Sequence, residues 1–274
     1  MTNPFGYAGK HVVVTGGATG VGSALLDVLA ENGRPDVTVL DVKVPPGPHA
    51  RFLATDLSDP AAVDAAIAQI EDPVDVLFNN AGVNSTAGIR TTIGVNFLAC
   101  RRLAEGLLPQ ISAGGAVVNT ASSAGNNWAA HRAELDQLLG IDDWEAAVSW
   151  TEAHRDLYEQ GHSDVYYFSK EALQLWTLKW SGGARSSGVR VNSVCPAPID
   201  TPLLADFRKT MTDKVIDWNI AQAGGRLMSP REVALPLAFL GSEAASYVSG
   251  VNLVVDGGFG AAMVTGQLDF SALA

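Results

Sequence analysis

Seven short runs rich in valine, leucine and isoleucine recur along the chain, separated by amphipathic segments of helical spacing. The runs are HVVVTG (11–16), VTVLD (37–41), RFLATD (51–56), DVLFNNAG (75–82), GAVVNTAS (115–122), VRVNSVCP (189–196) and VNLVVDGG (251–258). Nearly continuous apolar runs of this length are typical of strands in a parallel sheet that helices cover on both faces. The pattern therefore predicts a doubly wound α/β fold with a seven-stranded parallel sheet.

The amphipathic segments carry the start and stop signals of helices. The clearest segments are residues 21–33, 59–70 and 229–241. Asp59 stands in the capping position of the second, and Ser229 precedes a proline at the start of the third. Pro236 lies inside the third segment and weakens that helix prediction.

The length and the net charge of the chain limit the class of protein to which it can belong. The chain has 274 residues, and we expect a single domain over residues 1–274. A net charge of -11 argues against a nucleic-acid partner, because such binding needs clustered lysine and arginine. The N-terminus lacks a signal-peptide pattern, and no apolar run approaches the roughly 18 residues that a membrane span needs. We therefore expect a cytoplasmic protein with neither a nucleic-acid nor a membrane partner.

Cysteine and histidine usage predicts neither a disulfide nor a metal. Cys100 and Cys195 lie far apart in apolar contexts, which favours reduced, buried thiols. The five histidines show no metal-ligand spacing. We therefore expect no metal site.

One segment, residues 126–164, interrupts the alternation of strands and helices and is too long for an ordinary loop. We interpret it as a helical insert, with a helix that Asp142 caps and that stops at Gly161. The insert carries three tryptophans: Trp128, Trp144 and Trp150. These rings could wall a substrate pocket or pack the insert against the body of the protein, and the residues alone leave both interpretations open.

A glycine-rich turn, TGGATGVG, directly follows the first apolar run and opens the first helix. Gly16, Gly20 and Gly22 then stand where the chain must turn tightly and approach a pyrophosphate at a helix N-terminus. About twenty residues further on, Asp41 ends the second run, in position to accept hydrogen bonds from an adenosine ribose. Its carboxylate would repel a 2′-phosphate. The pattern predicts a Rossmann-like fold that binds NAD rather than NADP.

The stretch YYFSK places Tyr166 and Tyr167 ahead of Lys170. On a helix both offsets bring the side chains to the same face, so spacing alone permits either tyrosine as the partner of the lysine. A tyrosine can act as a base only if its pKa, about 10 in water, falls toward neutrality. A lysine ammonium about 5 Å away contributes about two pKa units at an effective dielectric constant near 20. We therefore expect Lys170 to lower the pKa of its partner.

Several motifs in the same order resemble the short-chain dehydrogenase/reductase family. They are TGGATGVG, NNAG, NTAS, the tyrosine–lysine stretch, ATDLSD, GVNFLA, VRVNSVCPAPIDTPL, GGRLMSPREVA and ASYVSGVNLVVDGG. Together they extend over nearly the full length of the chain. Within the family, the chain looks most similar to the bacterial 3α-hydroxysteroid dehydrogenase/carbonyl reductase group, through GATGVGSAL, the insert, DTPLL and the short tail after VVDGG.

The resemblance implies where the dinucleotide would bind. Asp56 and Leu57 would line the adenine site, the NNAG turn would pass near the cofactor, and Ile199 and Thr201 would hold the nicotinamide carboxamide. The implied cofactor-binding residues are Gly16, Gly17, Thr19, Gly20, Val21, Gly22, Asp41, Asp56, Leu57, Asn80, Gly82, Tyr166, Lys170, Pro196, Ile199 and Thr201.

The resemblance also resolves two ambiguous pairs. In the family, an asparagine stands three residues before the catalytic serine, which selects Ser122 over Ser123. The four-residue spacing to the lysine selects Tyr166 over Tyr167. Ser123 would then point away, and Tyr167 would pack or face a neighbouring element.

The implied catalytic set is Ser122, Tyr166, Lys170 and Asn96. Tyr166 would act as the general base, Ser122 would hydrogen-bond the substrate oxygen, and Lys170 would also hold the nicotinamide ribose. Asn96 would anchor a water that relays the proton. An isolated serine, asparagine or Tyr-x-x-x-Lys pair has ordinary structural uses, so these roles depend on the whole set.

Two departures from the family pattern affect the substrate and the assembly. Pro196-Ala197 replaces the usual Pro-Gly and is followed by Pro198, so the nicotinamide loop should be stiffer. The resemblance implies a homo-oligomer, a dimer or a tetramer. The insert leads directly into the tyrosine helix, where it would cover a face through which such proteins often dimerise.

The expected function is NAD-dependent interconversion of a secondary alcohol and a ketone on a hydrophobic cyclic substrate, a hydroxysteroid first of all. One alternative is a terpenoid or other non-steroid alcohol. Enoyl reduction would place a tyrosine seven residues ahead of Lys170, where this chain has Ser163. An alternative from another class is a non-catalytic protein that senses NAD and regulates a partner; it would tolerate the loss of Ser122, Tyr166 or Lys170.

Overall fold

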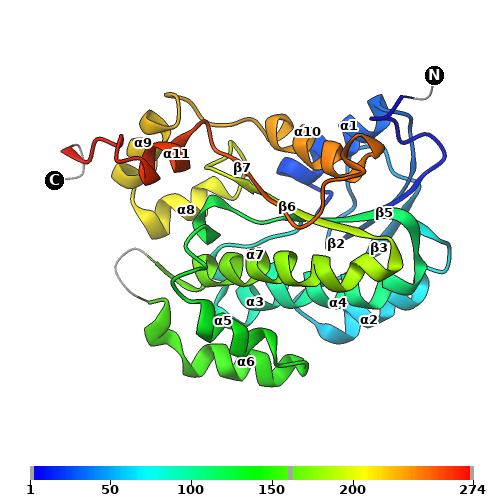
Figure 1. Ribbon diagram of the computed structural model, residues 1–274, viewed down its shortest axis with the longest axis horizontal. Coiled ribbons are helices and arrows are strands. Elements are labelled where there is room, and N and C mark those ends of the chain that lie inside the picture. Colours follow the sequence, from blue (N-terminus) through cyan, green and yellow to red (C-terminus); the bar gives the residue numbers. More distant parts are fainter. Residues whose placement is uncertain (1–2, 160–162, 272–274) are drawn as a thin grey trace.

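The structure is a computed structural model that describes residues 3–159 and 163–271. A seven-stranded sheet lies at its centre (Figure 1), and all neighbouring strands are parallel. The strand order is β3-β2-β1-β4-β5-β6-β7. The strands are β1 (His11–Thr15), β2 (Asp36–Asp41), β3 (Arg51–Ala54), β4 (Val74–Asn79), β5 (Ile111–Thr120), β6 (Arg190–Pro196) and β7 (Asn252–Val255). The predicted fold class is confirmed, and each of the seven apolar runs overlaps one strand.

The central strands are buried, as their apolar sequences predict. Every residue of β6 is buried, as are four of the five residues of β1. Two separate apolar cores flank the sheet, one on each face. A parallel sheet that is covered on both faces requires this arrangement, because neither face of its strands meets solvent.

Helices form the outer layers. They are α1 (Gly20–Glu31), α2 (Pro60–Gln69), α3 (Ile89–Ile93), α4 (Ala99–Leu107), α5 (Arg132–Leu139), α6 (Trp144–Ala153), α7 (Val165–Ala184), α8 (Leu204–Met211), α9 (Asp213–Gln222), α10 (Pro230–Gly241) and α11 (Phe259–Val264). Helices α1 and α10 pack together on one face of the sheet, and α2, α4 and α7 cover the other (Figure 1). A short π-helix, η2 (Gly94–Leu98), connects α3 and α4.

Asp59 and Ser229 cap the two helices for which the sequence predicted them. The Asp59 side chain accepts a hydrogen bond from the Ala61 N–H at 2.9 Å at the start of α2. Ser229 and Glu232 form a reciprocal capping box at the start of α10. Helix α10 continues through Pro236, so that proline does not end it.

The insert folds as α5, α6 and a short 3₁₀ turn, and both helices lie against the body of the protein beside α7 and α3 (Figure 1). The cap of α6 is Asp143, not Asp142 as predicted, because the Asp143 side chain accepts the Ala146 N–H at 2.8 Å. Asp142 forms an ion pair with Arg101 instead. Helix α6 ends at Ala153, and the predicted stop at Gly161 lies outside the described residues.

The sheet order reverses between β1 and β4, and the chain leaves the two strands toward opposite sides. In open parallel sheets, this reversal creates a crevice at the carboxyl ends of the strands. Helices α8, α9 and α11 lie at that end of the sheet (Figure 1). The crevice therefore has the sheet on one side and three late helices near its mouth.

Candidate active site

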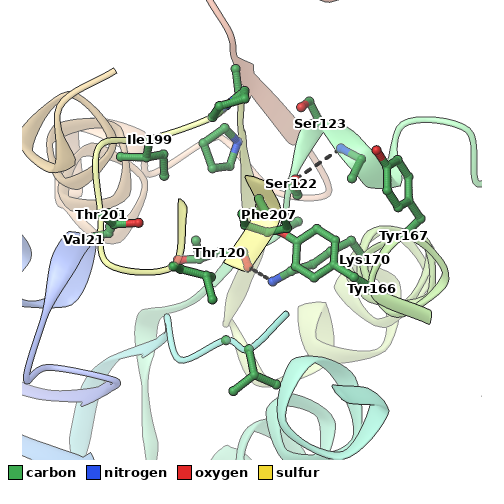
Figure 2. A pocket seen from close by; sticks show the side chains of 18 of the residues that line it. Val21, Thr120, Ser122, Ser123, Tyr166, Tyr167, Lys170, Ile199, Thr201 and Phe207 are labelled. Carbon is green, nitrogen blue, oxygen red and sulfur yellow. Dashed lines mark hydrogen bonds between the residues drawn. The ribbon is translucent and has the colours of Figure 1, made fainter. Parts of the chain in front are cut away.

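A cavity of about 1040 Å³ opens at the carboxyl ends of the strands. Its wall combines residues that follow the strands with residues of α7, α8, α9 and α11 (Figure 2). The predicted site residues in this wall are Gly16, Thr19, Gly20, Val21, Asp41, Asp56, Leu57, Asn80, Gly82, Ser122, Tyr166, Lys170, Pro196, Ile199 and Thr201. Gly17, Gly22 and Asn96 do not line the cavity.

The glycine turn between β1 and α1 leaves no room for side chains. Gly16 has φ +72°, and a Cβ atom there would lie 2.7 Å from Ala81 Cα. Gly20 has φ +54°, and a Cβ atom there would lie 3.1 Å from the Thr201 side chain. The bare backbone thus forms a cradle at the N-terminus of the twelve-residue helix α1, and this cradle suits a pyrophosphate.

Two other glycines of the turn serve packing rather than the cavity wall. A Cβ atom at Gly22 would lie 1.8 Å from the Gly16 carbonyl oxygen. A Cβ atom at Gly17 would lie 2.7 Å from the Val39 side chain on β2. Both glycines let α1 approach the sheet closely enough for the cradle to form.

The wall beyond β2 and β3 carries two oriented carboxylates. Asp41 accepts hydrogen bonds from the backbone N–H groups of Ala18, at 2.9 Å, and Lys43, at 3.0 Å. Asp56 accepts the Ser58 N–H at 2.9 Å. The hydrogen bonds from Ala18 and Lys43 hold the Asp41 carboxylate at the rim of the glycine cradle. There it could accept a hydrogen bond from a ribose hydroxyl of a bound dinucleotide.

The NNAG turn is tied to the glycine turn. The Asn80 side chain donates to the Gly16 carbonyl at 3.1 Å, and the Asn80 N–H donates to Thr15 Oγ1 at 3.0 Å. The Thr120 hydroxyl donates to Asn80 Oδ1 at 3.2 Å. These bonds connect β1, β4 and β5 across the crevice and fix its floor.

The loop after β6 is held by backbone contacts. Ile199 forms an isolated parallel bridge with Met228, and the Asp200 N–H donates to the Met228 carbonyl at 2.8 Å. Pro196 and Pro198 further limit the loop. Ile199 and Thr201 therefore have defined positions in the cavity wall, opposite the glycine turn (Figure 2).

Ser122, Tyr166 and Lys170 meet in the middle of the cavity wall (Figure 2). Ser122 follows β5 and lines the cavity with Tyr166, and its hydroxyl oxygen accepts the Ala124 N–H at 3.2 Å. Asp164 caps α7 by accepting the Tyr166 N–H at 2.8 Å, which fixes the start of the helix. The Lys170 ammonium donates to the Thr120 carbonyl at 2.8 Å and lies 5.7 Å from the centre of the Tyr166 ring.

The electrostatics of this group differ from the sequence-based expectation. Burial raises the pKa of Tyr166 above its ordinary value, and the nearby Ser122 hydroxyl offsets this only in part. Burial also lowers the pKa of Lys170 to about 8. The expected lowering of the tyrosine pKa is therefore not found in the protein alone, because desolvation weakens both charged forms.

Asn96 lies behind the cavity wall, in the π-helix. Its side chain accepts the Val83 N–H at 2.9 Å and donates to the Val83 carbonyl and to Ser169 Oγ, both at 3.0 Å. These bonds position the NNAG turn and connect it to α7. The structure thus gives Asn96 a structural role, and its catalytic role stays a prediction.

Ser123 and Tyr167 also line the cavity, which for Ser123 is contrary to the prediction that it would point away. Ser123 begins a 3₁₀ turn after β5, so strand alternation no longer decides where it points. Tyr167 contacts Met211 of α8 through its hydroxyl, at 3.6 Å. Both tyrosines therefore line the cavity, Tyr166 beside Lys170 (Figure 2) and Tyr167 in contact with α8.

Several apolar residues of the late helices complete the wall, and no motif in the sequence pointed to them. They are Phe207, Met211, Val215, Ile216, Trp218, Phe259, Met263 and Val264. Trp218 is fixed on three sides: its ring packs on Phe259 and Phe270, and its Nε1–H donates to the Asp269 carbonyl at 2.6 Å. These side chains form an apolar chamber next to Tyr166.

The tryptophans of the insert do not belong to this chamber, because none of them lines the cavity. Trp144 is buried in the core, with its ring 3.2 Å from where a Cβ atom on Gly94 would lie. Trp150 stacks on His154 and Phe168, and Trp128 packs at the edge of the same core. For all three, the structure supports packing rather than a pocket wall.

Metal and membrane features are not found in the described part of the chain. Residues 3–159 and 163–271 contain no group of three or more histidine, cysteine, aspartate or glutamate side chains that could hold a metal ion. No helix in these ranges has the length and apolar content needed to cross a membrane. Both cysteines are free and buried.

Two family models together match most of the chain. Residues 10–134 match the model described as short chain dehydrogenase, and residues 146–260 match the model described as Enoyl-(Acyl carrier protein) reductase. The gap between the two matches falls within the insert.

Individual proteins match over nearly their full length. Coniferyl-alcohol dehydrogenase from Pseudomonas sp. (strain HR199 / DSM 7063) is 32% identical, over 93% of this chain and 98% of that protein. The 3-alpha-hydroxysteroid dehydrogenase/carbonyl reductase of Comamonas testosteroni is 30% identical, over 92% of this chain and 97% of that protein.

A solved structure shows the same relationship in three dimensions. The 3-alpha-hydroxysteroid dehydrogenase from Pseudomonas sp. B-0831, complexed with NADH, has a TM-score of 0.77 and 29% identity, and covers 93% of this chain and 99% of that one. With the glycine turn, the strand order and the serine–tyrosine–lysine group in place, these matches establish that the chain is a member of the short-chain dehydrogenase/reductase family, an oxidoreductase of the type that interconverts alcohols and ketones.

Proposed function

We propose that this protein interconverts a secondary alcohol and a ketone on a hydrophobic cyclic substrate, with NAD as the cofactor and a hydroxysteroid as the leading substrate class. One observation carries the proposal. A single cavity holds the glycine cradle and Asp41 at one end and Ser122, Tyr166 and an apolar chamber at the other. A dinucleotide and a ring system of steroid size would meet at the tyrosine.

The choice of NAD rests on Asp41. Its carboxylate is held in place by two backbone N–H groups, so it cannot easily turn away from a ribose. A 2′-phosphate at this position would meet a negative charge, whereas a free ribose diol would donate hydrogen bonds to it. The relative from Pseudomonas sp. B-0831 is described with NADH, which supports the same choice.

The chemistry follows from three side chains. In alcohol oxidation, Tyr166 accepts the hydroxyl proton, and Ser122 hydrogen-bonds the substrate oxygen as it becomes a carbonyl. When bound, NAD supplies the hydride acceptor. Tyr166 must be ionised before it can accept that proton; Lys170 lies 5.7 Å from the Tyr166 ring, and its positive charge favours this tyrosinate.

The apolar chamber supports a hydrophobic substrate. Phe207, Trp218 and Phe259 contribute aromatic surface, and Met211 and Met263 add flexible apolar side chains. Relatives named for 3α-hydroxysteroids and cyclohexanol act on cyclic alcohols, and another is named for coniferyl alcohol. A terpenoid or aromatic alcohol is therefore the first alternative substrate.

The match to an enoyl reductase model does not favour enoyl reduction. That reaction would require a tyrosine at position 163, seven residues ahead of Lys170, and this position is Ser163. Tyr166, four residues ahead of the lysine, contacts Ser122 instead. The spacing therefore supports alcohol–ketone chemistry.

We also propose a cytoplasmic homo-oligomer, a dimer or a tetramer. Helices α5 and α6 of the insert pack beside α7 and α3, so subunits would have to associate through another face (Figure 1). Size-exclusion chromatography with light scattering tests this, and a monomer at micromolar concentration would contradict it.

A cofactor and substrate panel tests the function. The purified protein is assayed at alkaline pH with NAD and with NADP against hydroxysteroids, terpenoid alcohols, cyclohexanol and coniferyl alcohol. We expect turnover with NAD and the highest kcat/KM for a hydroxysteroid. Tight NAD binding without turnover of any alcohol would instead indicate a non-catalytic sensor of NAD.

A further inference from the structure

A histidine–glutamate pair lies in the cavity wall, apart from the serine–tyrosine–lysine group. His131 Nδ1 lies 2.6 Å from Glu171 Oε2, and both residues line the cavity. His131 comes from the insert, and Glu171 comes from α7, directly after Lys170. The reaction proposed above has no use for this pair.

The pair is a built arrangement rather than a surface contact. The Glu171 side chain is only 4% exposed, and that of His131 is 27% exposed. Carboxylates are almost never buried without a partner, because desolvation penalises the charge. Burial raises the pKa of Glu171, and the hydrogen bond with His131 counteracts that rise.

The contact determines which nitrogen of His131 faces a ligand. An ionised Glu171 accepts a hydrogen bond from Nδ1–H, so the neutral imidazole keeps its lone pair on Nε2. Within residues 3–159 and 163–271, no hydrogen bond to Nε2 of His131 is found. Because His131 lines the cavity, this nitrogen is available to accept a hydrogen bond from a hydroxyl group of a ligand.

The neighbouring residues show where along the substrate this acceptor lies. Tyr167 and Glu171 are four residues apart on α7, so their side chains lie on the same side of the helix. That side is next to the one that carries Tyr166 and Lys170. The five residues from Tyr166 to Glu171 correspond to a rise of about 7.5 Å. Glu171 therefore lies further along α7 than Tyr166, on the side where the distal end of a ring substrate would extend.

We propose that His131, oriented by Glu171, is a specificity-determining residue that accepts a hydrogen bond from a second, distal hydroxyl group of the ring substrate. This inference rests on the proposed function and narrows its substrate class to cyclic alcohols and ketones that carry a further hydroxyl. His131 contacts the substrate, and Glu171 is a positioning residue that acts through it.

The test compares two ketones, 17β-hydroxy-5α-androstan-3-one and 5α-androstan-3-one, that differ by one distal hydroxyl. Their affinities are measured by fluorescence titration of the complex of the enzyme with NAD, in which a ketone has no hydride donor and is not reduced. We expect His131→Phe to reduce the preference for the hydroxyketone, relative to wild type, by about tenfold. His131→Gln, which keeps a hydrogen-bond acceptor, should retain part of it.

His154→Phe is the matched control. This histidine belongs to the same insert, stacks on Trp150 and does not line the cavity, so the variant should keep the wild-type preference. For Glu171, the readout is the ¹⁵N spectrum of the His131 ring. Glu171→Leu should release the fixed tautomer, and Glu171→Gln should keep it in part.

The outcomes separate this inference from the proposed reaction. Equal preference in wild type and His131→Phe would overturn the role of His131, even if both ketones are reduced. Loss of the preference in the variant supports that role, even if neither ketone is reduced, which would count against the reaction alone. If neither ketone binds, both proposals are wrong for this substrate class.

Discussion

The two ends of the cavity are built in different ways. At the nucleotide end the backbone forms the wall, because Gly16 and Gly22 leave no room for a Cβ atom and Asp41 is held by two N–H groups. At the substrate end the wall consists of side chains from separate helices, such as Phe207 of α8 and Trp218 of α9. Backbone geometry needs particular residues at fixed spacing, whereas an apolar wall accepts many residues of suitable size.

This difference fits the names of the relatives. They share dehydrogenase activity, but the named substrates range from coniferyl alcohol to cyclohexanol and 3α-hydroxysteroids. A constant nucleotide end with a variable chamber would give one reaction and many substrates. The predictions below test whether the two ends can be changed independently.

The largest expected effect is at the point where the two ends meet. Tyr166→Phe removes the phenolic oxygen, which accepts the proton when it is ionised, and keeps the ring that packs on Phe207, at 4.8 Å between ring centres. We expect kcat to fall by about a thousandfold or more, within the range for loss of a general base. NAD binding, measured by titration calorimetry, should remain. Turnover within tenfold of wild type would remove Tyr166 from the mechanism.

A methyl group at the nucleotide end should be the next most damaging change. In Gly22→Ala, the added Cβ would lie 1.8 Å from the Gly16 carbonyl oxygen, so α1 must move away from the cradle. We expect a loss of about 3 kcal/mol or more in the free energy of unfolding and much weaker NAD binding. Denaturant unfolding and NAD titration measure both effects.

Gly182→Ala is the control for this change. Gly182 lies on α7, and a Cβ atom there would have no neighbour within 4 Å. Because alanine favours a helix over glycine, this variant should be about 0.5–1 kcal/mol more stable. If both alanine variants behaved alike, the idea that the backbone itself forms the nucleotide end would be wrong.

The sequence predicted the fold that carries the nucleotide end of the cavity. The seven apolar runs determine the sheet, and the glycine turn places Gly16 and Asp41 in one wall of the cavity. Local patterns carry this information, because strand period, turn chemistry and capping depend on a few neighbouring residues.

The features of the site that the sequence did not predict come from tertiary packing. Trp218 faces the cavity only because the segment around Asp269 and Phe270 returns to hold its ring. The pKa of Tyr166 rises because the folded chain buries it, and spacing to Lys170 says nothing about burial. Asp143 rather than Asp142 caps α6 because Arg101, from α4, forms an ion pair with Asp142.

A change of cofactor preference should be intermediate in size. Asp41→Asn keeps the shape of the side chain and removes the charge that would repel a 2′-phosphate. We expect the ratio of kcat/KM with NAD to kcat/KM with NADP to fall by about tenfold or more. Asp36→Asn, at the exposed start of the same strand, should leave the ratio unchanged. An unchanged ratio in Asp41→Asn would contradict the assignment of NAD specificity to this carboxylate.

The smallest expected effect comes from a pair of tryptophan variants, one in the apolar chamber and one in the insert. Trp218→Leu removes a ring that lines the cavity, so KM for the alcohol should rise by about tenfold while KM for NAD stays the same. Trp150→Leu removes a ring that stacks on His154 and Phe168, so it should lower the melting temperature and leave both KM values unchanged. Steady-state kinetics and thermal unfolding of the two variants distinguish these effects. If Trp150→Leu raised the alcohol KM as much as Trp218→Leu does, the insert would belong to the substrate end, and the chamber could not be changed independently of it.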